Sequence, residues 1–306
     1  TVNGVPLRIQ GRADAVRREN GVLRVLEIKT TTLPPSLIRL EDYPAHLAQA
    51  EIYAYLICAN EGIPEAEVTV FYDRMNGETR AFRKDRTLSE LRESFLKCAR
   101  PYADWIQLLG DWKEKSEPTL NNMRFPFPEP REGQREMAKT IFLSMKHSSN
   151  ALIEAPTGIG KTAASLYGAL KALGKGFITN VFYLTARTTG RRAAETALEI
   201  MRAQGVMIRS VAITAKEKCC PMEKVECFGC PNAAGYYERR GQALREGMSI
   251  QALDAEKIAA LAQKYEICPH ELSLDLSEQA DVIICDYNYA FDPRVRLRRF
   301  FDHKSN

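Results

Sequence analysis

The sequence predicts an α/β protein built from two domains of different architecture. Residues 5–115 contain two β-hairpin patterns, each around an Asn-Gly pair, together with two helical patterns. Residues 131–306 alternate helical patterns with short apolar runs, which is typical of a parallel, doubly wound sheet. The 306 residues also match about two domains of ~150 residues each.

The first domain is expected to be an α/β core with a mixed sheet. Its hairpins turn at Asn20-Gly21 and Asn76-Gly77, and apolar residues recur at helical spacing over 44–60, between the two hairpins. Thr87 and Glu90 have the spacing of a capping box, which opens a long amphipathic helix. We therefore expect this domain to cover residues 1–116.

Residues 117–130 contain four prolines and little periodicity, so we expect a linker there with neither helix nor central strand. The second domain, 131–306, then has apolar strand patterns alternating with helical ones. The expected helices cover residues 131–146, 161–173 and 188–204, and the expected strands cover 150–155, 180–186, 207–213 and 281–287. A helix-rich, cysteine-containing insertion at 215–275 separates the last two strands.

Composition excludes several classes of protein. With 45% hydrophobic and 27% charged residues, the chain is neither disordered nor fibrous, and no apolar run reaches the ~20 residues of a membrane helix. The net charge of +4 falls entirely after residue 115, but it is too small to establish a nucleic-acid partner. Without a signal-peptide pattern, we expect a cytoplasmic protein whose clustered cysteines bind metal before they form disulfides.

Residues 155–162, APTGIGKT, have the pattern of a phosphate-binding loop between a strand and a helix. Glycines let the backbone N–H groups surround a phosphate chain, the lysine reaches the β- and γ-phosphates, and the threonine hydroxyl ligates Mg²⁺. The predicted ATP-binding residues are Ala155, Thr157, Gly158, Gly160, Lys161 and Thr162. No acidic pair follows to complete the Mg²⁺ site, so we expect this chain to bind ATP but hydrolyse it poorly.

Five of the eight cysteines lie between residues 219 and 268. Four thiolates can hold a zinc ion or an iron–sulfur cluster, and both alternatives are open at this point. The spacing favours a ligand set of Cys220, Cys227, Cys230 and Cys268. Cys219 is an alternative first ligand, although we prefer Cys220, and Cys285 in an apolar run is expected to be a core residue.

The phosphate loop, the segment ITAKEKCCPMEKVECFGCP and the segment CPHELSLDLSEQADVIICDYNYAFDP together resemble the first motor domain of XPD/DinG-family helicases. The resemblance implies a RecA-like domain of an ATP-driven helicase that moves 5′ to 3′ along single-stranded DNA. It also implies a 4Fe–4S cluster on the four cysteines, phosphate contacts from Leu184–Thr189 including Arg187, and an adenine contact from Gln134. Solvation of Gln134 is an equal alternative, and a polar strand end is the alternative for Leu184–Thr189.

In the first domain, Asp14 is expected on one hairpin strand and Glu27 and Lys29 on its partner. Residues two apart on a strand share a face, so the hairpin can bring two carboxylates and a lysine together. Such oxygen ligands suit Mg²⁺ or Mn²⁺, and the lysine can orient a water that attacks a phosphodiester. A solvated strand face is the alternative.

Gln49 and Tyr53, one helical turn apart, extend this set into a G-x-x-D, E-x-K, Q-x-x-x-Y series. The series resembles RecB-like nucleases of the PD-(D/E)xK class. The resemblance implies metal-dependent DNA cleavage, with Asp14 and Glu27 as metal ligands. The family's upstream histidine has no counterpart, and His46 follows the E-x-K strand and does not replace it.

The expected protein is therefore a DNA-repair or DNA-processing enzyme that combines a helicase motor with a nuclease, and we expect both domains to be truncated at their outer ends. The expected cofactors are ATP, Mg²⁺ or Mn²⁺ and a 4Fe–4S cluster, and the expected partner is mainly single-stranded DNA, with no membrane. Two alternatives are a helicase whose first domain is an inactive DNA-binding clamp and a zinc-stabilised nucleotide-binding protein. DNA against RNA preference, cutting polarity and oligomeric state stay open.

Overall fold

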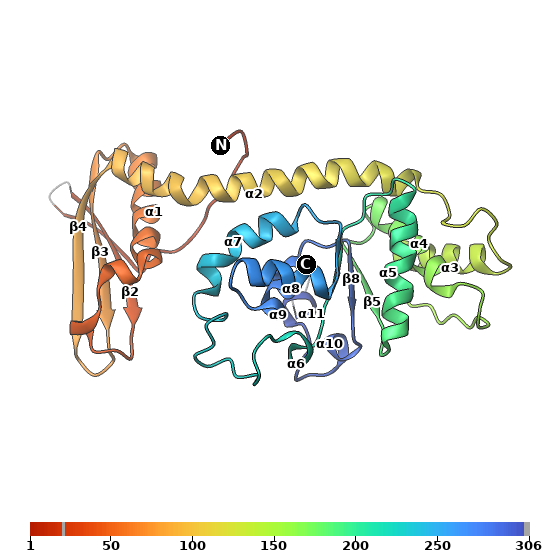
Figure 1. Ribbon diagram of the computed structural model, residues 1–306. Coiled ribbons are helices and arrows are strands. Elements are labelled where there is room, and N and C mark those ends of the chain that lie inside the picture. Colours follow the sequence, from red (N-terminus) through yellow and green to blue (C-terminus); the bar gives the residue numbers. More distant parts are fainter. Residues whose placement is uncertain (20–21, 303–306) are drawn as a thin grey trace. The chain divides into compact units, whose positions relative to one another are not determined.

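The computed structural model describes residues 1–19 and 22–302 and divides the chain into two compact units, Thr1–Leu108 and Leu109–Asn306 (Figure 1). Each unit has its own four-stranded sheet, mixed in the first and parallel in the second. The predicted fold class is confirmed. No helix in the described part of the chain is both long and apolar enough to cross a bilayer.

The sheet of the first unit follows chain order. It contains β1 (Ala15–Glu19), β2 (Val22–Thr30), β3 (Glu65–Asp73) and β4 (Thr79–Thr87). β1 and β2 pair antiparallel, as do β3 and β4, whereas β2 and β3 run parallel. The turn expected at Asn20-Gly21 lies outside the described residues, and the turn expected at Asn76-Gly77 joins β3 to β4 as predicted.

Two 3₁₀ helices, Pro35–Leu37 and Leu40–Asp42, and the helix α1 (Pro44–Glu61) connect β2 to β3. A parallel strand pair needs such a crossover. α1 buries its small residues Ala50, Ala54 and Cys58 against apolar side chains of β2 and β3. This packing brings one face of α1 close to the strand that carries Glu27 and Lys29.

α2 (Leu88–Asn122) begins with the predicted capping box: the Thr87 backbone N–H donates to the Glu90 carboxylate at 2.8 Å. The helix runs on through residues 117–122, so the expectation that no helix forms there is wrong. Tertiary contacts compensate for the proline at 118. Leu120 is buried in the core of the second unit, and the Asn121 side-chain amide donates to the Gly174 carbonyl at 2.7 Å.

The second unit alternates helices and strands after α2. Its elements are α3 (Gln134–Lys146), α4 (Lys161–Gly174), β5 (Val181–Leu184), α5 (Thr188–Ala203), β6 (Ser210–Ala212), α6 (Lys216–Cys219), α7 (Tyr236–Gly247), β7 (Ala252–Leu253), α8 (Ala255–Lys264), α9 (Pro269–Ser277), β8 (Val282–Cys285), α10 (Asn288–Phe291) and α11 (Arg298–Phe301). The parallel strands lie in the order β5-β8-β6-β7. The insertion predicted between β6 and β8 is therefore helical, with β7 extending the sheet.

The strand expected at residues 150–155 does not form in the structure. This segment has irregular backbone, and the Leu152 side chain is fully exposed. A strand is stabilised by hydrogen bonds to a neighbouring strand, and no described segment pairs with this one. The apolar sequence before the phosphate loop is typical of a strand, but in this structure no described strand pairs with it.

A largely enclosed polar cluster lies at the start of β8 in the second unit. The Asp281 carboxylate accepts hydrogen bonds from the Arg209 backbone N–H at 2.7 Å and from the Trp112 indole N–H at 3.3 Å. The Arg209 guanidinium, 1% exposed, lies 4.0 Å from the centroid of the Trp112 ring. Burial raises the pKa of Asp281, and the charge of Arg209 opposes that shift.

Candidate functional site

In the first unit, β2 and α1 bring three of the predicted residues into one hydrogen-bonded set. The Lys29 ammonium donates to Glu27 Oε1 at 2.7 Å and to Gln49 Oε1 at 3.0 Å. Glu27 and Lys29 share a face of β2, and Gln49 comes from the turn of α1 that packs beside it. We call Asp14, Glu27, Lys29 and Gln49 the acid–lysine set.

Asp14 lies just before β1 and approaches this set through the backbone. Its Oδ2 accepts the Ile28 N–H at 2.7 Å, between Glu27 and Lys29. Glu27 is only 3% exposed, and its second oxygen, Oε2, has no hydrogen-bond partner among the described residues. A buried carboxylate oxygen without a donor is costly, so this position favours a bound cation.

Tyr53, one turn after Gln49, packs against the backbone rather than joining these hydrogen bonds. A Cβ added to Gly11 would come within 2.6 Å of the Tyr53 ring, so a larger residue at this point of the G-x-x-D pattern would displace the ring. His46 also lies near the set, with Nδ1 2.8 Å from the Tyr72 hydroxyl. Burial and the charge of Lys29 lower the pKa of His46, and Glu27 opposes the shift.

Across residues 1–19 and 22–302, no group of three or more His, Cys, Asp or Glu side chains is arranged to hold a metal ion, so the four predicted cluster cysteines are not gathered around one point. In the acid–lysine set this leaves two carboxylates, Asp14 and Glu27, with the unpartnered Glu27 Oε2 as the open oxygen. The donor chemistry fits Mg²⁺ or Mn²⁺, with water filling the remaining positions.

The phosphate loop of the second unit is folded on itself. Lys161, the first residue of α4, donates to the carbonyls of Ala155 at 3.1 Å and Pro156 at 2.9 Å. Gly158 and Gly160 both have positive φ, which lets the chain turn tightly into α4. Thr157 is exposed in the loop, and the Thr162 hydroxyl lies 3.2 Å from that of Tyr183.

Gln134 is buried, at 1% exposure, and contacts this loop directly. Its Nε2 donates to the Ile159 carbonyl, and its Oε1 accepts the Arg131 N–H at 2.8 Å. The Arg131 guanidinium in turn donates to the Gly158 carbonyl. The solvated alternative for Gln134 therefore does not hold in this structure. The residue is instead hydrogen-bonded to the phosphate loop.

The cysteines of the second unit lie on three segments. Cys219 ends α6 and Cys220 follows it, Cys227 and Cys230 lie on an exposed irregular loop, and Cys268 caps α9. The Cys268 N–H donates to the Asn232 carbonyl at 3.0 Å, which ties the start of α9 to this loop. All eight cysteines are free thiols. Cys285 is buried in β8, as predicted, and burial raises its pKa to about 12.

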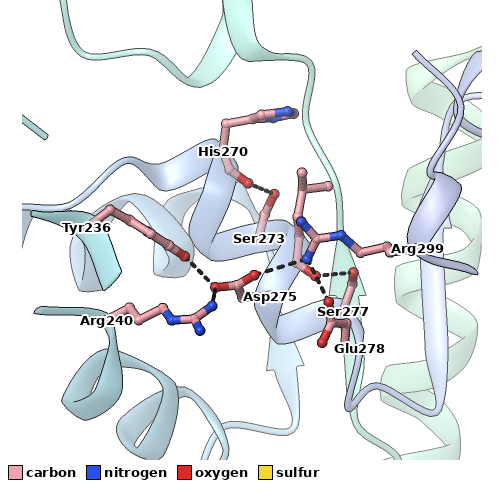
Figure 2. Close-up of polar contacts among 9 residues, drawn as sticks. Tyr236, Arg240, His270, Ser273, Asp275, Ser277, Glu278 and Arg299 are labelled. Carbon is pink, nitrogen blue, oxygen red and sulfur yellow. Dashed lines mark hydrogen bonds and ion pairs between the residues drawn. The ribbon is translucent and has the colours of Figure 1, made fainter. Parts of the chain in front are cut away.

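A carboxylate on α9 ties α9 to α7 and α11. Asp275 accepts hydrogen bonds from the Tyr236 hydroxyl at 2.9 Å, from Arg240 at 2.6 Å and from Arg299 at 3.0 Å (Figure 2). Tyr236 and Arg240 belong to α7, and Arg299 belongs to α11. The helix that begins after Cys268 is thereby fixed against the helix that follows the Cys230 loop.

A cavity of about 760 Å³, which we call the carboxyl-edge cavity, lies where β5, β6 and β8 end. Because parallel strands end at one edge, the predicted phosphate-contacting segment after β5 meets the segments after β6 and β8. Eight basic residues line it: Arg187, Arg191, Lys216, Lys218, Arg294, Arg296, Arg298 and Arg299. Six of them contact a carboxylate, whereas Arg187 and Lys218 have no ion pair among the described residues.

Sequence reasoning did not identify the contribution of residues 294–299 to this cavity. The indicator was available, because four arginines fall within six residues. Their position beside Arg187 depends on α10 and α11 turning back over the end of the sheet: the Leu297 N–H donates to the Tyr289 carbonyl at 2.8 Å. No periodicity in the sequence predicts that return.

Two family models match the chain. Residues 197–305 match the DEAD_2 family, and residues 1–139 match the PD-(D/E)XK nuclease superfamily. The first match contains the cysteines and most of the carboxyl-edge cavity, and the second contains the acid–lysine set. Each covers less than half of the chain, and the phosphate loop lies between them.

The similar proteins include helicases. A regulator of telomere elongation helicase 1 homolog from Caenorhabditis elegans is 24% identical over 232 residues, which are 60% of this chain and 23% of that protein. Its Caenorhabditis briggsae counterpart is 25% identical over 235 residues, 60% of this chain and 23% of that protein. The chain thus spans less than a quarter of these relatives. An XPD helicase structure aligns at 21% identity and a TM-score of 0.41, covering 58% of this chain and 31% of that one.

Proposed function

We propose that this chain is part of an ATP-dependent DNA helicase that acts in DNA processing, with a metal-dependent nuclease in its first unit. The observation that carries the helicase proposal is the carboxyl-edge cavity, whose lining is strongly basic. In open parallel sheets, ligands bind at the carboxyl ends of the strands. The DEAD_2 match over 197–305 and the helicase relatives support the same function.

Arg187 and Lys218 are the residues best suited to hold a phosphate backbone. Neither has a carboxylate partner among the described residues that line this cavity, so their charges are available to a ligand. Phosphate contacts of this kind position a strand without reading its sequence, as a translocating motor requires. From the resemblance to XPD/DinG helicases, we infer single-stranded DNA as the track and 5′ to 3′ as the direction.

ATP would bind at the phosphate loop. When bound with Mg²⁺, it supplies the energy for strand separation. Lys161, which now contacts the loop carbonyls, would turn to the β- and γ-phosphates, and Thr162 would hold the metal ion. Gln134 donates a hydrogen bond to the Ile159 carbonyl of the loop. It would also contact adenine and so couple binding of the base to the loop. We infer a cytoplasmic protein with this activity.

We infer that Cys220, Cys227, Cys230 and Cys268 hold a 4Fe–4S cluster. The hydrogen bond between Cys268 and Asn232 already brings the remote cysteine to the loop of the other two. Cys219 is the alternative first ligand, and its thiol lies 3.8 Å from the Thr214 and Lys216 carbonyl oxygens. The cluster would supply a rigid cross-link between α6, the exposed loop and α9.

For the nuclease, Asp14 and Glu27 would hold Mg²⁺ or Mn²⁺, which when bound stabilises the charge that develops on the phosphate. Lys29 is held by Glu27 and Gln49 and would orient the attacking water. Tyr53 would keep the Gly11 segment, and with it Asp14, against α1. The superfamily match over residues 1–139 supports this assignment.

The helicase proposal is tested by the affinity of the chain for a fluorescent single-stranded oligothymidine. We expect Arg187→Ala with Lys218→Ala to weaken binding at least tenfold and to reduce its salt dependence. Lys264→Ala, at an exposed residue that ends α8, is the control and should leave the affinity unchanged. Equal affinity for all three proteins would contradict the proposed role of the cavity.

The nuclease proposal is tested by cleavage of the same DNA with Mn²⁺. Lys29→Ala should lower the rate about 100-fold or more, the range for a residue that aids proton transfer. Lys97→Ala, an exposed lysine of α2, should cleave like the original chain. If Lys29→Ala cleaves at the original rate, the first unit is a DNA-binding clamp and the nuclease assignment is wrong.

A further inference from the structure

A second cavity, of about 710 Å³, lies on the second unit and is separate from the sites above. We call it the α3–α4 cavity, since residues of α3, the last two turns of α4, the end of α2 and the irregular segment 123–130 line it. α3 and α4 pack closely behind it, because a Cβ on Gly168 would come within 2.5 Å of the Ala138 carbonyl oxygen. The volume lies within the range of small-molecule sites.

The charge of this cavity is entirely positive. No Asp or Glu is among the described residues that line it. Five basic side chains do so: Arg124, Arg135, Lys139, Lys171 and Lys175. None of these five forms an ion pair within the described part of the chain. Five unpaired cations around one hollow repel one another, and a bound anion would relieve that repulsion.

Lys171 shows the effect of this crowding. Its ammonium donates to the Asn121 carbonyl at 2.8 Å and lies 5.7 Å from the Tyr167 ring centroid. Burial and the nearby charge of Lys175 lower the pKa of Lys171. The Lys171 ammonium therefore has a carbonyl, a ring face and a second ammonium as neighbours, but no anionic partner.

Aromatic rings form the apolar part of the same wall. Phe125 and Tyr167 meet edge to face with centroids 5.2 Å apart, and Phe127 meets Phe125 at 6.2 Å. Phe127 is 37% exposed, so part of its side chain is accessible to a ligand. Phe142 on α3 adds a fourth ring. Open rings beside lysines and arginines are the combination that binds nucleic acid bases together with their phosphates.

The lysines of this cavity are separate from the phosphate loop. Lys161 begins α4, whereas Lys171 lies in its last turn and Lys175 directly follows it, and at 1.5 Å per residue ten residues of helix span about 15 Å. None of the loop residues 155–162 lines the cavity. Phosphates bound by these lysines would therefore be additional to those held by the phosphate loop.

We propose that the α3–α4 cavity binds one nucleotide of a single-stranded DNA segment, with its base stacked on Phe127 and its phosphates held by Lys139 and Lys175. This deepens the proposed function and rests on it, because it places a second contact for the strand on which the motor acts. Stacking accepts any base, so the site is independent of sequence. The strand would be held at two places on the second unit.

Three variants of the whole chain test the proposal against fluorescent oligothymidine. Phe127→Ala removes a ring that is partly exposed and should weaken binding about tenfold. The double variant Lys139→Glu with Lys175→Glu should weaken binding further. It should also reduce the steepness of the dependence of log affinity on log salt concentration by about 1.4 or more, since each of two lost phosphate contacts contributes roughly 0.7. Lys146→Glu, on α3 but outside the cavity, is the matched control and should have a much smaller effect.

Photocrosslinking of a bromodeoxyuridine-substituted strand locates the contact. We expect crosslinked peptides that contain Phe127 or Tyr167, and we expect the crosslink to disappear in Phe127→Ala. If Phe127→Ala binds normally and crosslinks map only to the carboxyl-edge cavity, the inference is wrong while the proposed function stands. If the chain binds no single-stranded DNA, both are wrong.

A free nucleotide is the other source of the same chemistry. An excess of ATP should not displace the crosslink to Phe127, because ATP would bind at the phosphate loop. If ATP protects the Phe127 peptide and oligothymidine does not, the site is for a free nucleotide and the strand proposal is overturned. Circular dichroism of each variant checks that the fold is retained.

Discussion

The acid–lysine set and the four predicted cluster cysteines differ in how their geometry is produced. Glu27 and Lys29 lie two residues apart on one strand, and Gln49 meets them from a helix packed on that strand, so their side chains are already hydrogen-bonded. Cys227 and Cys230 lie on an exposed, irregular loop, and a backbone hydrogen bond from Cys268 to Asn232 links this loop to the start of α9. Secondary structure therefore positions the side chains of the acid–lysine set. Cys227 and Cys230 are positioned by irregular backbone instead.

The difference indicates what each site needs from a metal. Buried Glu27 Oε2 lacks a donor, so a cation there would satisfy a group that the fold has already placed. The cysteine segment has little core of its own, and a cluster would have to supply cross-links that the chain does not. We therefore expect metal removal to cost more stability in the second unit than in the first.

The largest effect should follow Cys230→Ser. Loss of one of four ligands should remove the bound iron and the visible absorbance of the cluster, and should lower the free energy of unfolding by about 4 kcal/mol, as for loss of a tightly bound ligand. Iron analysis and denaturant unfolding measure both. Cys98→Ser, an exposed cysteine of α2, is the control. Stoichiometric zinc in colourless protein would show that the cluster assignment is wrong.

Asp281→Ala tests whether the second unit has a rigid part beside its irregular loop. Removing this carboxylate leaves the Arg209 guanidinium buried without its charge partner and frees the Arg209 N–H, which should cost about 3 kcal/mol. Chemical unfolding measures the change. Glu114→Ala, at an exposed residue, is the control and should leave the free energy of unfolding nearly unchanged. If Asp281→Ala lowers this free energy no more than Glu114→Ala does, the proposed role of the Asp281–Arg209–Trp112 contacts is contradicted.

Glu27→Gln sharpens the comparison from the side of the first unit. Saturating Mn²⁺ should raise the free energy of unfolding of the original chain by about 2 kcal/mol through binding to the folded state. In Glu27→Gln the ion loses a charged ligand, and this stabilisation should vanish. Thermal unfolding with and without Mn²⁺ gives both values, with Glu93→Gln as control. An unchanged response in Glu27→Gln would place the ion elsewhere.

The smallest effect concerns Asp254, which caps α8 by accepting the Lys257 N–H at 2.9 Å. Burial alone would raise its pKa, but the bonds and charge of Lys257 hold the pKa below the ordinary 3.8. Its stabilisation is therefore complete above pH 3.8 and is lost as pH falls through the lower folded pKa. Asp254→Ala should cost about 1 kcal/mol at neutral pH and less in acid, measured by urea unfolding at both pH values. A cost that does not decrease in acid would contradict this account.

Much of the fold was predictable because its elements have local signatures. The hairpin at Asn76-Gly77, the capping box of Thr87 and Glu90, and the alternating helices and strands of the second unit all follow from short-range patterns. Two expectations failed because tertiary contacts were made in one case and missing in the other. Residues 117–122 are helical because Leu120 and Asn121 contact the core of the second unit, whereas residues 150–155 pair with no described strand.

For the sites, the sequence by itself determined which residues are chemically competent: the carboxylates and lysine of the first unit, the phosphate loop and the clustered cysteines. Spacing along one strand or one helix was enough to bring Glu27 and Lys29 together. Only the tertiary structure decided that Glu27 Oε2 is buried without a donor, that Gln134 bonds the phosphate loop, and that residues 294–299 line the carboxyl-edge cavity. The physical reason is that burial and encounters between distant segments depend on how the elements pack, which no local pattern specifies.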